Sequence, residues 1–228
     1  MSHRHALALL GLMLVAIGLF ERSWLLLAVW LGGDFLALGV AHARGFHRIL
    51  GKRSDGSLPL WSWLVFLPML LYTNAGWQIL RVLSREPPLN QVTENLSVGR
   101  RLLPGEVEGE FANYIDLTAE FPEPLAIRRS NAYLSFPILA GAAPDLKALN
   151  EFLNRLRPGR TFVHCAQGHG RTGLFALALM LKSGAVKTMG EGLEKLKVVR
   201  PGINLAAIQR ECIEQFAVAF NTRLVGKE

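Results

Sequence analysis

VHCAQGHGRTG, residues 163–173, contains two overlapping motifs. Counted from Gly168, the stretch reads GHGRTG and fits the dinucleotide-binding pattern G-x-G-x-x-G. Counted from Cys165, it reads one cysteine, five residues and Arg171, which is the spacing of a phosphate-binding loop with a cysteine nucleophile. The two motifs predict different chemistry, so the sequence around them has to decide between them.

The flanking sequence predicts strands mixed with helices. Apolar residues at helical spacing, among them Leu149 and Leu153, indicate a helix that begins after Pro144-Asp145, where Asp145 suits the first turn. Such a mixture is typical of an α/β layer fold. Strands are expected at residues 113–118, 133–138 and 161–164, and helices at 145–156, 171–183, 187–199 and from Asn204 onward.

The dinucleotide motif lacks the second half of its fold. That fold needs a parallel strand after the glycine-led helix, with an acidic residue about 20 positions on to bind the ribose. Here the predicted helix is followed by a turn and a further helix, and Glu191 and Glu194 lie within that helix rather than after a strand. The dinucleotide interpretation is therefore disfavoured.

The cysteine motif accounts for every residue of the stretch. Cys165 ends a predicted strand, and the loop leads into a helix N-terminus, whose free N–H groups and positive dipole end favour an anion and lower a thiol pKa. Three glycines allow the backbone to curl around a phosphate. Arg171 can donate two parallel hydrogen bonds to phosphoryl oxygens, and Thr172 can bond the sulfur when it leaves. His164 is expected to orient the loop.

Residues 164–173, HCAQGHGRTG, resemble the HCxxGxxR[ST]G signature of cysteine-dependent tyrosine and dual-specificity phosphatases, with a layout similar to bacterial membrane-anchored members. Residues 116–122 and 199–203 extend the resemblance. It implies a small domain with a central sheet flanked by helices, which hydrolyses phosphomonoesters through a phosphocysteine intermediate. It also implies that Cys165, Arg171 and Thr172 are catalytic, without cofactor or metal. The phosphate would be bound by Ala166, Gln167, Gly168, His169, Gly170 and Arg171.

The expected general acid is missing. After Tyr133-Leu-Ser-Phe-Pro-Ile-Leu139, such phosphatases usually carry an aspartate followed by glycine, whereas Ala140 precedes Gly141 here. General acids typically contribute about 10²- to 10⁴-fold in rate. Asp145 and Glu120 are the candidate substitutes. The alternative is a phosphatase-like module that recognises phosphate without turnover.

The first part of the chain is rich in apolar residues. Apolar segments at about 6–20, 23–41 and 60–80 predict a membrane-embedded helical region at 1–83, followed by a catalytic domain at 84–228. Residues 6–41 are too long for one spanning helix, so a hairpin turning at Glu21-Arg22 is expected. A cleaved signal peptide, with Ala41-His42-Ala43 as its cleavage site, is the alternative interpretation.

The charges of the chain also favour a membrane setting. Four of the seven formal positive charges belong to residues 1–83, beside apolar segments, which indicates anionic lipid headgroups rather than nucleic acid. The sequence thus predicts a multi-pass protein of the cell membrane. Its partners would be the lipid bilayer and a phosphorylated protein or phospholipid substrate. The catalytic domain is cytoplasmic if segment 60–80 does not cross, and outside if it does.

The two cysteines predict no disulfide framework and no metal site. A reduced compartment is the expected setting. Cys212 falls in a helical pattern near the end of the chain and is expected to be a small core residue.

Overall fold

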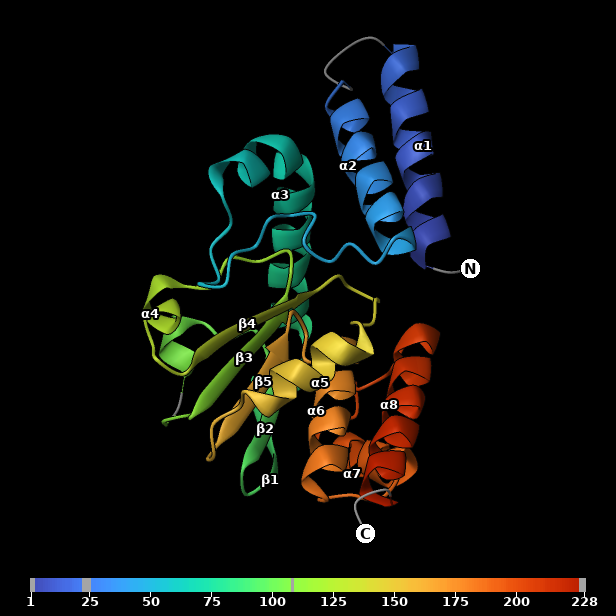
Figure 1. Ribbon diagram of the computed structural model, residues 1–228. Helices are drawn as coiled ribbons and strands as arrows, with labels where there is room; N and C mark the ends of the chain where they lie inside the picture. Colours follow the sequence, from blue (N-terminus) through green and yellow to red (C-terminus); the bar gives the residue numbers. More distant parts are fainter. Residues whose placement is uncertain (1–2, 22–25, 108, 226–228) are drawn as a thin grey trace.

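The computed structural model describes residues 3–21, 26–107 and 109–225. A five-stranded sheet forms its centre, with the strand order β1-β2-β5-β3-β4 (Figure 1). β1 pairs antiparallel with β2, and the other neighbours are parallel, so β2, β3, β4 and β5 end at one edge of the sheet. The strands are β1 (Leu89–Thr93), β2 (Leu96–Arg100), β3 (Asn113–Thr118), β4 (Tyr133–Ile138) and β5 (Thr161–Cys165).

Helices pack against the sheet in the C-terminal half of the chain. α6 contacts β5 and β2, and is itself contacted by α7 and α8 (Figure 1). α6 is apolar on nearly all sides because the sheet and these two helices surround it. The helices of this half are α4 (Leu125–Arg128), α5 (Leu146–Asn154), α6 (Gly170–Ser183), α7 (Met189–Val199) and α8 (Ala207–Val225), and Pro104–Glu106 form a 3₁₀ turn.

These elements confirm the predicted α/β fold. The three predicted strands and four predicted helices are present, although α8 begins at Ala207 rather than directly after Asn204. Cys212 is buried among core residues, as expected. β1 and β2 were not predicted. The polar residues of β1 give it no clear alternation of apolar and polar positions.

The first two helices form the predicted pair. α1 (His3–Glu21) and α2 (Leu26–Ala43) lie side by side and meet at glycines (Figure 1). A Cβ atom added to Gly11 would lie only 2.7 Å from the carbonyl oxygen of Gly32, so a larger residue there would force the helices apart. Arg22, at the predicted hairpin turn, lies outside the described residues.

The predicted location in the cell membrane as a multi-pass protein is wrong. Within residues 3–21, 26–107 and 109–225, no helix combines the length and the hydropathy that crossing a bilayer requires. α3 (Leu60–Leu83) covers the third predicted segment, but its helical geometry breaks at Phe66, and Pro68 follows. The same helix buries Phe66, Met69, Leu70 and Trp77 against the rest of the protein.

The segment between α2 and α3 enters the core of the sheet domain. Leu50 and Leu58 are buried, and the Lys52 ammonium reaches the end of β3 to pair with Asp116. Residues before position 84 thus contribute to the same core as the sheet. The division into domains at 1–83 and 84–228 stays a prediction.

Candidate active site

The loop from Cys165 to Arg171 lies between the end of β5 and the start of α6, at the edge where the parallel strands end. In parallel α/β sheets, ligands bind outside the carboxyl ends of the strands. A cavity of about 500 Å³ opens over this loop. Its lining includes Cys165 and five of the six residues predicted to bind the phosphate, namely Ala166, Gln167, His169, Gly170 and Arg171.

The loop backbone is fixed from behind. Gly168 has a φ of +76°, and a Cβ atom there would lie 2.3 Å from the carbonyl oxygen of Gly99, so both conformation and space require glycine. Arg200 is almost fully buried and donates from Nε to the carbonyl of Gly168 (3.0 Å) and from Nη2 to that of Gln167 (2.9 Å). Because these two carbonyl oxygens bond to Arg200 outside the cavity, the N–H ends of the peptide dipoles are left to favour an anion within the cavity.

Trp77 of α3 fixes the same loop from another side. Its indole Nε1 donates a hydrogen bond to the carbonyl of Ala166 at 3.0 Å, and the side chain is only 3 % exposed. The ring lies 5.8 Å from that of Phe121, and the Arg101 guanidinium lies 5.1 Å above the indole. α3 is thereby tied to the loop by a hydrogen bond, and to the segment after β2 by cation–π packing.

The surroundings of Cys165 favour its thiolate. Burial raises the pKa of this thiol, but the Arg171 charge and hydrogen bonds from the Thr172 side chain and from the amides of Thr172 and His169 outweigh it, so the pKa is lowered. Thr172 is fully buried, and its bond to the departing sulfur stays a prediction. A thiolate is the nucleophilic form of cysteine.

Glu120 holds the guanidinium of Arg171. Nη1 and Nη2 donate to the two carboxylate oxygens at 2.8 and 2.6 Å, and Nη1 also donates to the carbonyl of Ile138 at 2.8 Å. Burial alone would lower the pKa of Arg171, but the Glu120 charge raises it well above its ordinary value. The site therefore presents a fixed positive charge beside Cys165.

The structure separates the candidate acids. Ala140 lines the cavity. Asp145 caps α5, where its Oδ1 accepts from the Ala148 amide at 2.9 Å, and it is not among the residues that line the cavity. Glu120 lines the cavity, but although burial raises its pKa, Arg171 lowers it further, so the carboxylate is ionised at neutral pH. In this arrangement Glu120 positions Arg171 and has no proton to donate.

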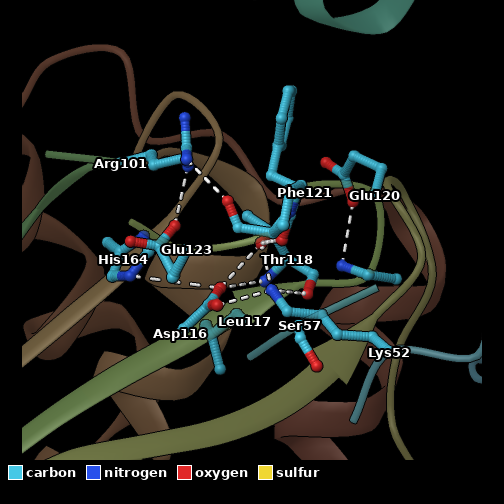
Figure 2. Close-up of polar contacts among 12 residues, drawn as sticks. Lys52, Ser57, Arg101, Asp116, Leu117, Thr118, Glu120, Phe121, Glu123 and His164 are labelled. Carbon is cyan, nitrogen blue, oxygen red and sulfur yellow. Dashed lines mark hydrogen bonds and ion pairs between the residues drawn. The ribbon is translucent and has the colours of Figure 1, made fainter. Parts of the chain in front are cut away.

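A buried polar network supports the strand ends below the loop (Figure 2). Asp116 accepts from Lys52 at 2.5 Å and from the Tyr133 hydroxyl at 2.7 Å. Glu123 accepts from Arg101 at 2.7 Å. Figure 2 shows the Lys52–Asp116 and Arg101–Glu123 contacts, with His164 beside Asp116. Burial lowers the pKa of His164 to about 4, so the imidazole is neutral and suits a packing role.

Asp116, Glu123 and His164 could in principle hold a metal ion, because one ligand atom from each lies within 4.8 Å of the others. The Lys52 ammonium, however, already bonds to Asp116 and to the Thr118 carbonyl (2.7 Å). A cation of the protein itself thus supplies the positive charge, and this cluster does not fit a metal ion well.

Sequence reasoning missed the residues that fix the loop from outside. Glu86 accepts from the Gly202 amide at 2.7 Å and lies 2.6 Å from His169 Nε2, so it joins the loop to the segment after α7. Trp77 and Arg200 were missed as well. Each acts on backbone atoms far away in sequence, and no local pattern signals such contacts.

No family model matches this sequence, and no curated protein does. Solved structures match in fold. Tk-PTP in its active form is 23 % identical, with a TM-score of 0.52, and the match covers 57 % of this chain and 97 % of that one. PTPMT1 in complex with PI(5)P is 13 % identical, with a TM-score of 0.52 and coverages of 60 % and 99 %. The human tyrosine phosphatase-like serine/threonine/tyrosine-interacting protein is 14 % identical, with a TM-score of 0.51 and coverages of 59 % and 99 %.

These matches show that the chain has the fold of the tyrosine and dual-specificity phosphatases. At such low identity they carry no further conclusion about activity. One of them is named as a phosphatase-like interacting protein, so the fold alone does not decide between catalysis and recognition.

Proposed function

We propose that this protein is a cysteine-dependent phosphatase that hydrolyses phosphomonoesters of a protein or a phospholipid. The observation that carries the proposal is Cys165 itself: a buried thiol of lowered pKa, at the floor of a cavity, beside the fixed Arg171 guanidinium. A module that only recognises phosphate needs the arginine and the loop amides but has no use for an activated thiol.

The proposed reaction has two steps. The Cys165 thiolate attacks phosphorus, an S–P bond forms, and the P–O bond to the leaving group breaks. Water then attacks the phosphocysteine, an O–P bond forms, and the S–P bond breaks to restore the thiolate and release inorganic phosphate. The attacking water gives one proton to solvent, which balances the proton that the departing oxygen takes from solvent in the first step. Arg171 and the loop amides stabilise the charge on the phosphoryl oxygens in both steps. Because the loop amides and Arg171 provide this stabilisation, the proposed reaction needs no metal ion.

The second candidate is a recognition module without turnover. The observation that favours it is Ala140, a methyl group at the place in the cavity where an acid is expected. Hydrolysis of an activated aryl phosphate separates the two candidates, because such a leaving group departs without a proton. Release of phosphate from the aryl ester is expected of the enzyme, whereas binding of the ester without release would establish the module.

The Ala140→Asp variant is expected to hydrolyse an alkyl phosphate about 10- to 100-fold faster than the wild type, with a smaller change for the aryl phosphate. A carboxylic acid at this position can protonate a poor leaving group. The measurement is kcat on both substrates for the wild type, Ala140→Asp and Asp145→Asn. If Ala140→Asp has no effect and Asp145→Asn loses alkyl turnover, Asp145 is the acid, against the position found here.

Treatment with a chelator is expected to leave the hydrolysis rate unchanged, because Arg171 and the loop amides meet the phosphoryl charge. The measurement is aryl phosphate turnover before and after removal of metal ions. A loss of activity that one added divalent metal restores would contradict the prediction.

A further inference from the structure

One wall of the active-site cavity is made by α3. Tyr72, Thr73, Gly76, Trp77 and Leu80 of this helix line the cavity that contains Cys165. Tyr72 and Leu80 keep 62 % and 53 % of their surface exposed, although Trp77 beside them is buried on the loop. α3 therefore places apolar side chains at the mouth of the cavity, where the part of a substrate beyond its phosphate would lie.

A second, smaller cavity adjoins the first. It has a volume of about 140 Å³ and shares Thr73, Glu120 and Ala140 with the active-site cavity. An apolar cavity of about 150 Å³ is large enough to bind benzene. Most of its lining comes from apolar residues of α1, α2, α3 and the loops beside them, namely Leu7, Phe35, Leu38, Leu50, Met69, Leu139 and Ala140.

Two polar residues of the second cavity, His42 and Glu120, bring no uncompensated charge to it. His3 and His42 pack edge to face, with 5.7 Å between ring centroids. Burial lowers the pKa of His42 to about 4, so its imidazole is neutral at pH 7. Glu120 directs both carboxylate oxygens at Arg171. The space thus suits hydrocarbon rather than a charged or peptide group.

From these two cavities we infer that the substrate is a phosphomonoester with a flexible apolar chain. Its phosphate lies in the Cys165 loop, and its chain passes α3 and the small Ala140 side chain toward the second cavity. A carboxylate at position 140 would border this path, whereas a methyl group leaves it apolar. The inference rests on the proposed role of the loop as a phosphate site, and it names the class of substrate.

Binding of n-alkylphosphonates, which are not hydrolysed, tests the inference on the full chain. Calorimetry with ethyl-, butyl-, hexyl- and octylphosphonate, below their micelle thresholds, is expected to show affinity that rises about threefold per added methylene. Inorganic phosphate should displace octylphosphonate. Equal affinity along the series, or octylphosphonate that phosphate does not displace, would overturn the inference. So would a phosphotyrosine peptide that binds more tightly than octylphosphonate.

Two pairs of variants test where the alkyl chain of the ligand lies. Leu7→Trp fills the second cavity and is expected to reduce the ratio of octyl to ethyl affinity at least fivefold, whereas Leu9→Trp, exposed on the same helix, keeps the ratio. Leu80→Ser is expected to reduce the ratio about threefold, and the neighbouring Ile79→Ser to keep it. If Leu7→Trp does not fold, the second pair still decides, and an unchanged ratio in Leu80→Ser would count against the inference.

These experiments distinguish failure of the inferred substrate class from failure of the phosphatase proposal. If the chain hydrolyses aryl phosphate but binds all phosphonates alike, the phosphatase proposal stands and the inferred apolar chain is wrong. If affinity rises with chain length but no ester is hydrolysed, the site binds amphiphilic phosphates and the catalytic proposal fails.

Discussion

The Cys165→Ser variant is expected to lose hydrolysis of an aryl phosphate by at least about 10⁴-fold, as is typical when a nucleophile is removed. Arg171, Thr172 and two loop amides stabilise a thiolate at this position, and a serine hydroxyl remains protonated in the same surroundings. The measurement is phosphate release at several pH values. In the wild type, kcat/KM should reach its plateau below the ordinary thiol pKa of about 8.5, because the pKa of Cys165 is lowered.

Cys212→Ser provides the matched control. Cys212 is also buried, but burial raises its pKa to about 11, and it lies in α8, outside the cavity lining. This variant is expected to retain turnover, so a general effect of losing a buried thiol can be excluded. Cys165→Ser should still bind inorganic phosphate through Arg171. Undiminished hydrolysis in Cys165→Ser would remove the thiolate mechanism.

The loop could be predicted from sequence because its chemistry is local. The nucleophile, the glycines, Arg171 and Thr172 fall within nine residues, and the strand and helix on either side have clear periodicity. Both motifs need a strand, a glycine turn and a helix N-terminus, so these elements do not distinguish them. Only the sequence after α6 excluded the dinucleotide motif. The structure confirms that a further helix, α7, follows α6.

The supports of the loop could not be predicted in this way. Trp77 bonds to Ala166 across 89 positions, and Lys52 reaches Asp116 across 64. A lysine in a basic segment and a tryptophan at the end of an apolar one both resemble residues at a membrane boundary. Only the tertiary structure shows that the ammonium lies in the core and that the indole packs on the loop after Cys165.

The prediction of a multi-pass membrane protein failed for a related reason. An apolar helix is typical both of a bilayer and of a protein core, and the two differ mainly in length and in the absence of interruptions. α3 contains Pro68, and its helical geometry breaks at Phe66. Met69, Leu70 and Trp77 of this helix are buried against the rest of the protein. Several of its residues also line the cavity that contains Cys165.

The Lys52→Met variant is expected to lower the free energy of unfolding by about 3–5 kcal/mol, the usual cost of leaving one partner of a buried ion pair unpaired. The Lys52 and Asp116 side chains are 1 % and 0 % exposed, and Nζ also bonds to the carbonyl and hydroxyl of Thr118. The measurement is urea unfolding at pH 7. Lys195→Met, on the exposed face of α7, is the control and should change stability by less than about 0.5 kcal/mol.

The pH dependence identifies the pair as the cause. Burial alone raises the pKa of Asp116, but Lys52 and the Thr118 hydrogen bonds lower it to about 2. The stability that this carboxylate contributes is therefore present above the ordinary aspartate pKa of about 3.9 and is lost as the pH falls toward 2. In Lys52→Met the buried carboxyl has no ammonium partner, so the difference in stability from the wild type should shrink over that pH range.

Adding Asp116→Asn to Lys52→Met removes the unpaired charge and should recover part of the loss of stability at pH 7. A loss that is independent of pH, and that the second substitution does not reduce, would show that Lys52 contributes by packing its hydrocarbon chain rather than by its charge.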